Sequence, residues 1–173
     1  MTEIALSRCT LRPWRPGDEP SLERYANNRN VSRNLRDRFP YPYTATDAKE
    51  WIAFAAALTP PVQHFAIVVD GNAAGGISVE PGEGERRRSA EVGYWLGEPL
   101  WGRGIATTAL RAITEYGFET FDVCRLEAGV FAWNPASARV LEKAGYTLEG
   151  RARLAVIKDG QMTDRLLYAL VRP

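Results

Sequence analysis

The sequence predicts a mixed α/β (α+β) fold in which helices cover both faces of one largely antiparallel, twisted sheet of about seven strands. In the second half of the chain, short apolar segments alternate with longer segments of helical periodicity, the pattern of strands connected by crossover helices. In the first half, two short apolar runs are joined by Asp-Gly, which is typical of an antiparallel hairpin. With 173 residues, 45% of them hydrophobic, the chain can bury one core and is expected to form a single domain over residues 1–173.

The elements are expected in the order strand, helix, helix, strand, strand, strand, helix, strand, helix, strand, strand. Their expected ranges are, in the same order, 4–14, 18–30, 48–58, 63–70, 73–81, 89–97, 104–120, 125–133 and 134–145, followed by a strand on each side of the turn at residues 159 and 160.

Local signals set the boundaries in the first half. The alternation of residues 4–14 ends at Pro13, and the first helix is expected to begin at Asp18. Asp47 is the expected N-cap of the second helix, because Glu50 stands three residues later as in a capping box. Asp-Gly at residues 70 and 71 supplies the positive φ that a tight hairpin turn needs.

Helices join successive strands in the second half. Connections of this kind place strands parallel through right-handed crossovers, so we expect parallel neighbours here and antiparallel ones in the first half. Asn134 followed by Pro135 has the pattern of an N-cap with proline at the first helical position. The sheet is therefore expected to be mixed.

Composition excludes several classes of protein. The net charge is only +1, which argues against a general nucleic-acid binder, and no run of about 18 apolar residues predicts a membrane span. Cys9 and Cys124 are far apart, so neither a disulfide framework nor a zinc site is indicated. The N-terminus lacks the apolar core of a leader peptide. We expect a cytoplasmic protein without a metal and without a membrane or nucleic-acid partner.

Residues 101–107, "WGRGIAT", form a loop suited to an anion. Gly102 and Gly104 leave backbone N–H groups unshielded, and Ala106 is nearly as small. The following helix adds its partial positive N-terminus and Arg103 a full charge, so a pyrophosphate would fit. The plainer alternative is a tight strand-to-helix turn. A dinucleotide fingerprint fits poorly, because Thr107 stands where a third small residue belongs, and the GK[ST] of a P-loop is missing.

The segments "AEVGYWLGEPLWGRGIATTAL" and "WNPASARVLEKAGY" resemble the GNAT superfamily of acetyl-CoA-dependent N-acetyltransferases, most closely its RimJ/RimL-type branch. The resemblance covers essentially the whole chain. It implies a GNAT fold, acetyl-CoA as cosubstrate and direct transfer of acetyl to a primary amine, either a protein N-terminus or a small molecule. Many relatives form homodimers, so the resemblance allows one here.

The resemblance also assigns a coenzyme site. The backbone of the strand before the loop would pair with the pantetheine chain, and the loop would hold the pyrophosphate. Asn134, which matches an Asn of the relatives, would bind the pantetheine or phosphate arm. Arg139 and Lys143 are further neighbours for phosphate. The implied coenzyme-binding residues are Gly93, Tyr94, Trp95, Leu96, Trp101, Gly102, Arg103, Gly104, Ile105, Ala106, Thr107, Asn134, Arg139 and Lys143.

Two residues are candidates for catalysis. Glu91 occupies a position that serves as the base in some superfamily members; alternatively it is a strand-end carboxylate paired with an arginine of the run 86–88. Many members carry a tyrosine acid where Leu141 stands here. RimJ/RimL-like proteins often have a serine at the position of Ser137, proposed to protonate the leaving thiolate. An ordinary serine in the first turn of a helix is the alternative.

An aromatic wall is expected around the acceptor. Relatives build this wall from their first helices, where this chain has Phe39, Tyr41, Tyr43 and Trp51, which suggests a peptide or a hydrophobic amine. These side chains, like those of Tyr94 and Trp95, are alternatively part of the core. His64, the only histidine, is expected to be structural.

Three other functions remain open at this point. Leu141 in place of the usual tyrosine is consistent with a non-catalytic acyl-CoA sensor. The loop could serve a nucleotide-binding enzyme. Three consecutive arginines at residues 86–88 are a weak signal for a nucleic-acid-binding module.

Overall fold

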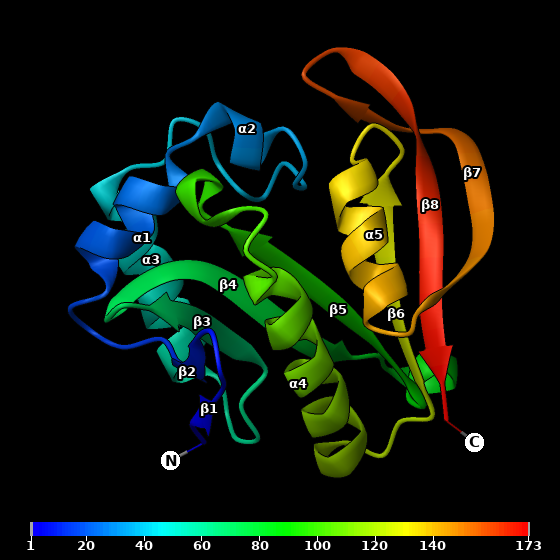
Figure 1. Cartoon of the computed structure of the whole chain (residues 1–173), viewed down its shortest axis with the longest axis horizontal. Helices are drawn as coiled ribbons and strands as arrows, with labels where there is room; N and C mark the ends of the chain where they lie inside the picture. The colour runs from blue at the N-terminus through cyan, green and yellow to red at the C-terminus, as the bar shows by residue number, and fades with distance from the viewer. Residues whose placement is uncertain (1, 173) are drawn as a thin grey trace.

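One eight-stranded sheet runs through residues 2–172, the part of the chain that the computed structural model describes (Figure 1). The ends of the expected domain, residues 1 and 173, lie outside it. The elements are β1 (Ile4–Ala5), β2 (Thr10–Pro13), α1 (Glu19–Ala26), α2 (Arg29–Ser32), α3 (Ala45–Ala57), β3 (His64–Val69), β4 (Asn72–Pro81), β5 (Ser89–Leu96), α4 (Ile105–Thr120), β6 (Arg125–Phe131), α5 (Pro135–Lys143), β7 (Thr147–Lys158) and β8 (Gln161–Val171), with short 3-10 turns at Gly84–Arg86 and Glu98–Leu100.

The strand order is β1-β2-β3-β4-β5-β6-β8-β7, and within residues 2–172 only β5 and β6 pair in parallel. This confirms the expected mixed, mostly antiparallel sheet with helices. The expectation of parallel neighbours at both crossovers is half right. The connection through α5 does not make β6 and β7 neighbours, because β8 folds back from its hairpin with β7 and takes the place between them.

The segment 4–14 is two strands where one was expected, which gives eight strands in place of seven. β1 and β2 pair with each other in antiparallel fashion, with Ile4 opposite Leu11. The Leu6 N–H donates to the Cys9 carbonyl at 2.9 Å and closes the turn between them. The alternation therefore belongs to a small hairpin whose turn contains polar residues 7 and 8.

The first two helices also differ from expectation. Residues 18–30 divide into α1 and α2, because the Asn28 side chain accepts hydrogen bonds from the N–H groups of Asn30 and Val31 and starts a new helix. In α3 the N-cap is Thr44 and not Asp47. The capping box is formed by Thr44 and Asp47, so the helix begins three residues earlier than expected.

The hairpin between β3 and β4 is confirmed. Asp70 and Gly71 have φ angles of 47° and 79°, as a tight primed turn requires. The helical ranges of α4 and α5 also agree with expectation to within a few residues.

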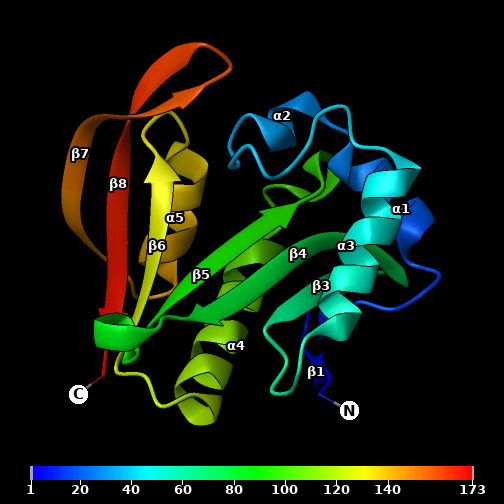
Figure 2. The ribbon, with the colours of Figure 1, turned by 180° about the vertical axis from the view of Figure 1, so that it is seen from behind.

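Helices cover the two faces of the sheet unequally. α4 and α5 lie on the face toward the viewer in Figure 1, while α3 crosses β3 and β4 on the opposite face (Figure 2). The core beneath α4 and α5 is built around Phe65, Ile67, Leu110 and Leu126. A second cluster of buried residues joins α1 and α3 to the sheet through Trp14, Leu22, Tyr43, Ile52 and their neighbours. Among residues 2–172, no helix is long and apolar enough to cross a membrane.

Candidate active site

The two parallel strands separate halfway along their length. β5 and β6 are paired only from Ser89–Glu91 with Arg125–Glu127. Beyond Glu91, β5 continues to pair with β4 and β6 with β8, so the facing edges of β5 and β6 have no strand partner. A cleft of about 980 Å³ opens at this place. Its volume is at the upper end of the range of roughly 300–1,000 Å³ typical of small-ligand sites.

The glycine loop lines one end of the cleft. Gly102 and Gly104 have φ angles of 73° and 74°, which explains why glycine stands at both positions. Gly104 is the N-cap of α4, and no side chain caps the helix. The N–H groups of the first turn have no partner within the helix, and residues 104–107 line the cleft, so the positive end of the helix dipole lies at its edge. The loop thus has the open donors that an anion requires.

Two side-chain contacts hold this loop in shape. The Trp101 indole Nε1 donates to the Leu96 carbonyl at 2.7 Å, which ties the loop to the end of β5. Arg8, from the turn between β1 and β2, donates to the Arg103 carbonyl at 2.9 Å. The contact of Arg8 links the loop to a residue that lies 95 positions earlier in the chain.

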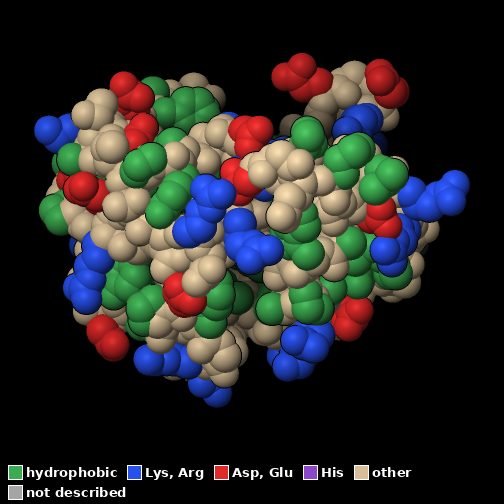
Figure 3. All heavy atoms as spheres, turned by 90° about the horizontal axis from the view of Figure 1, so that it is seen from above, with side chains coloured by type: hydrophobic (Ala, Val, Ile, Leu, Met, Phe, Trp, Pro, Cys, Tyr) green, Lys and Arg blue, Asp and Glu red, His purple; other side chains and the backbone are tan. Residues whose placement is uncertain are grey.

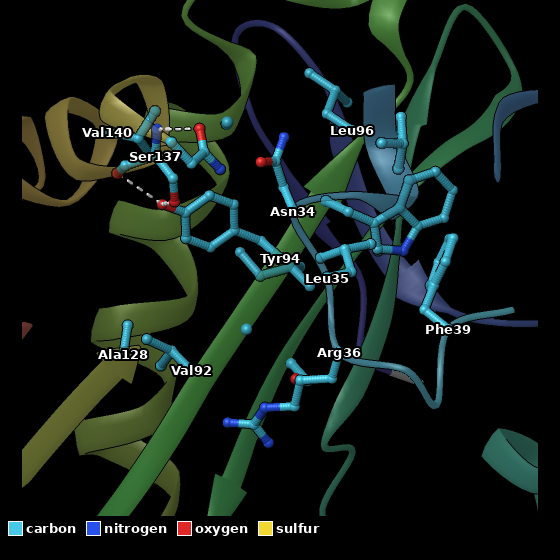
Figure 4. Close-up of a pocket in the computed structure, with 18 of the residues that line it drawn as sticks. Asn34, Leu35, Arg36, Phe39, Val92, Tyr94, Leu96, Ala128, Ser137 and Val140 are labelled. Atoms are coloured by element: carbon cyan, nitrogen blue, oxygen red, sulfur yellow. Dashed lines mark hydrogen bonds between the residues drawn. The ribbon is translucent and has the colours of Figure 1, made fainter. Parts of the chain in front are cut away.

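The N-terminus of α5 lies on the other side of the cleft. Asn134 caps this helix by accepting a hydrogen bond from the Ser137 N–H at 3.3 Å. The Tyr94 hydroxyl from β5 lies 2.8 Å from the Ser137 Oγ and 3.1 Å from the Ser137 carbonyl oxygen. Figure 4 shows the Tyr94 ring directed at Ser137. Burial raises the pKa of Tyr94 well above its usual value, so this hydroxyl is protonated at neutral pH.

Glu91 lies where β5 and β6 begin to separate, and it lines the cleft. Its carboxylate forms an ion pair with Arg36, from the segment between α2 and α3, and not with the run 86–88 as the alternative interpretation expected. In that run, Arg86 pairs with Glu127 and Arg88 with Asp122. The Glu91 side chain is 35% exposed, so a bound molecule can reach it.

Three glutamates form a row across the sheet. Glu80 on β4 lies opposite Glu91, and Glu91 opposite Glu127 on β6. Side chains of directly paired residues point to the same face of a sheet, so all three carboxylates share one face. Each is paired with an arginine, Arg38 in the case of Glu80. Glu80 and Glu91 line the cleft, whereas Glu127 does not.

Aromatic side chains line the cleft on the side of α3. Phe39 packs against Trp95 with ring centroids 5.4 Å apart, and Trp51 packs against His64 at 5.2 Å. Burial lowers the pKa of His64, while the nearby Glu80 carboxylate opposes this shift. Tyr41 is the exception among the expected acceptor residues. It is 47% exposed, lies under the Arg29 guanidinium and does not line the cleft.

The remaining expected site residues all line this one cleft. They are Glu91, Ser137, the β5 residues 93–96, the loop residues 101–107, Asn134, Arg139, Lys143, Phe39 and Trp51. Sequence reasoning missed Arg36 and Arg165, which also line it. No motif marks either of them, because their place depends on how distant segments meet.

The comparisons with known proteins agree with this geometry. Residues 8–147 match the family model described as "Acetyltransferase (GNAT) domain", so the chain belongs to the GNAT acetyltransferase family. The probable N-acetyltransferase YjcK of Bacillus subtilis is 41% identical over 86 residues, which are 50% of this chain and 48% of YjcK. The chain spans about half the length of YjcK and of two other Bacillus subtilis relatives that it matches, YdaF and YoaA.

Solved structures show the same fold over nearly the whole chain. RimL, a ribosomal L7/L12 alpha-N-protein acetyltransferase solved in complex with coenzyme A, has a TM-score of 0.87 at 23% identity and covers 99% of this chain and 98% of its own. Mycobacterium smegmatis RimJ, solved in complex with CoA-disulfide, has a TM-score of 0.82 at 27% identity and covers 94% of this chain and 81% of its own.

Proposed function

We propose that the protein is an acetyl-CoA-dependent N-acetyltransferase that transfers acetyl to a primary amine by direct attack. The observation that carries the proposal is the cleft between the separated strands, with open backbone donors at one end and the Glu91 carboxylate at the other. Membership of the GNAT family and the coenzyme A bound to RimL and RimJ support it.

The coenzyme would bind along the cleft. The N–H groups from Gly102 to Thr107 and the positive end of α4 would hold the pyrophosphate, with Arg139 and Lys143 as additional positive charges. The free edge of β5 from Gly93 to Leu96 would pair with the pantetheine amides. Acetyl-CoA would supply an activated acetyl group, and a β5 N–H would stabilise negative charge on its carbonyl oxygen.

Glu91 would act as the general base. An alkylammonium group has a pKa near 10.4, so at neutral pH a base must remove one proton before the amine can attack the thioester. The neutral nitrogen then forms its bond to the acetyl carbon and loses a second proton as the carbon–sulfur bond breaks. In this structure the Glu91 carboxylate forms an ion pair with the Arg36 guanidinium. An acceptor amine would have to bind the same carboxylate together with Arg36 or displace Arg36 from it.

Ser137 and Tyr94 would return a proton to the departing thiolate. Their hydroxyl groups share one hydrogen bond at the N-terminus of α5, and the helix dipole favours negative charge there. Tyr94 comes from β5 and provides a phenolic hydroxyl although Leu141 stands where many family members have tyrosine.

The experiment is a comparison of Glu91→Gln with Glu127→Gln, using thiol release from acetyl-CoA in the presence of an accepted amine. We expect Glu91→Gln to lower kcat by about 10²- to 10⁴-fold, while acetyl-CoA still raises the melting temperature as in the wild type. Glu127 is the matched control, because it shares the same row but does not line the cleft. An unchanged rate for Glu91→Gln would remove Glu91 from its role.

A further inference from the structure

Arg165 on β8 places a guanidinium group in the cleft. It is directly paired with Phe131 on β6, and its side chain lies over Gly129 two residues earlier. A Cβ atom at position 129 would meet the Arg165 Nε, so the glycine leaves the guanidinium room to lie against the β6 backbone. By the alternation of β6, Gly129 and Phe131 share the face of Glu127 and therefore of Glu91. Arg165 thus lies on the same face of the sheet as Glu91.

The charge of Arg165 has no counterion among residues 2–172. No carboxylate lies within 4.0 Å of its nitrogen atoms, in contrast to Arg36, which pairs with Glu91, and Lys158, whose Nζ lies 2.9 Å from Asp37. The Arg165 side chain is partly buried. A cation removed from part of its hydration shell gains more from an anionic partner than one on the open surface.

A second cavity of about 390 Å³ adjoins the first at this point. Arg36, Phe131 and Arg165 line both cavities, and the second extends beneath residues 155–158 of the β7–β8 hairpin. Its charged lining residues are Arg36, Asp37, Lys158 and Arg165, a formal balance of three positive charges against one negative. Figure 3, a view of the end of the molecule where this hairpin lies, shows basic and acidic side chains interspersed over the surface.

We propose that Arg165 binds a carboxylate of the acceptor, so that the substrates of this enzyme are primary amines that also carry a carboxylate. The inference rests on the proposed function, since it places the acceptor amine at Glu91. The acceptor amine would then lie beside the Glu91 carboxylate, and the carboxylate of the acceptor would lie beside Arg165 at the second cavity. The planar fork of a guanidinium matches the two oxygens of a carboxylate, and one residue can therefore both bind and orient the acceptor.

The test uses pairs of acceptors that differ only in charge. One arm compares peptides whose second residue is aspartate with the same peptides carrying asparagine. The other arm compares free amino acids with their amides. Within each pair, the concentration of the unprotonated amine is kept the same. We expect the wild type to favour the acid over its neutral partner by about 10- to 100-fold in kcat/KM in at least one arm. The arm that shows the preference identifies where the carboxylate is placed.

Variants connect the preference to Arg165. Arg165→Gln is expected to lower kcat/KM for the acids to the value for their neutral partners, while acetyl-CoA still raises the melting temperature. Gly129→Ala is a second variant, because its added methyl group would displace the guanidinium without removing it. Arg153→Gln is the matched control: it removes an exposed positive charge from the same hairpin, outside both cavities.

Three results would overturn the inference, and they fall into two distinguishable kinds. Equal turnover of acids and neutral partners by the wild type, or a preference that survives in Arg165→Gln, would refute the carboxylate subsite and leave the acetyltransferase intact. If neither the acids nor their neutral partners give thiol release from acetyl-CoA, the proposed function itself is refuted, and the subsite with it.

Discussion

At the scale of single residues, the hydroxyl groups of Tyr94 and Ser137 make the most specific contact of the cleft. They come from β5 and the first turn of α5, 43 positions apart, and approach to 2.8 Å (Figure 4). Because burial raises the pKa of Tyr94, this hydroxyl remains a proton donor throughout the neutral and alkaline range in which an amine acceptor is active.

If the two hydroxyls act as one unit, removing either disables both. We expect Tyr94→Phe and Ser137→Ala each to lower kcat by about 10-fold, below the usual range for general acids because a thiol is a good leaving group. The double variant should be no slower than the slower single one. The measurement is kcat for all four proteins, with the melting temperature as a check on folding. Fully multiplicative losses would contradict a shared role.

Residue types and motifs predicted some of the residues that line this cleft, and there is a physical reason why they did not predict the others. The loop 101–107 could be found because strand, loop and helix are contiguous in the chain, and Glu91 was assigned through the resemblance to the GNAT superfamily. Arg36 and Arg165 could not, since they reach the cleft from 55 and 74 positions beyond Glu91 in the two directions of the chain. Tyr41, expected in the acceptor wall, does not line the cleft, and exposed and cleft-lining aromatics have the same local sequence pattern.

At the scale of elements, the start of α3 shows how two equally good local signals compete. Thr44 with Asp47 and Asp47 with Glu50 both fit a capping box. In the structure the Thr44 N–H donates to the Asp47 carboxylate at 2.7 Å, and the Asp47 N–H donates to the Thr44 Oγ1 at 3.3 Å. Starting at Thr44 adds almost one further turn to the helix that covers β3 and β4.

This cap makes a prediction about stability. Thr44→Ala is expected to lower the free energy of unfolding by about 1 kcal/mol, because it leaves an N–H group of the first turn without a partner. Glu50→Ala should change it by less than about 0.5 kcal/mol, since Glu50 is an exposed helical position. Urea denaturation measures both. A larger loss for Glu50→Ala than for Thr44→Ala would mean that the helix begins at Asp47.

At the scale of the whole molecule, the cleft is a consequence of sheet topology. Among residues 2–172, β5 and β6 are the one parallel pair. They separate after three paired residues on each strand, beyond which β5 stays paired with β4 and β6 with β8. Figures 1 and 2 show β5 following β4 and β6 following β8. From β3 to β8, the order of the strands and helices could be predicted from local patterns, whereas the division of residues 4–14 into β1 and β2 and of residues 18–30 into α1 and α2 could not. The insertion of β8 between β6 and β7 could not, because strand pairing depends on contacts between distant residues.

The most direct test of the account is free-thiol release from acetyl-CoA by the wild-type protein. Pools of peptides with different N-termini, amino acids, polyamines and aminoglycosides are each compared with a control that lacks the acceptor, and binding of acetyl-CoA is measured in parallel. The account predicts release that depends on the acceptor and is strongest in a pool of carboxylate-bearing amines. Binding of acetyl-CoA without release from any pool would contradict catalysis and favour a sensor built on the same fold.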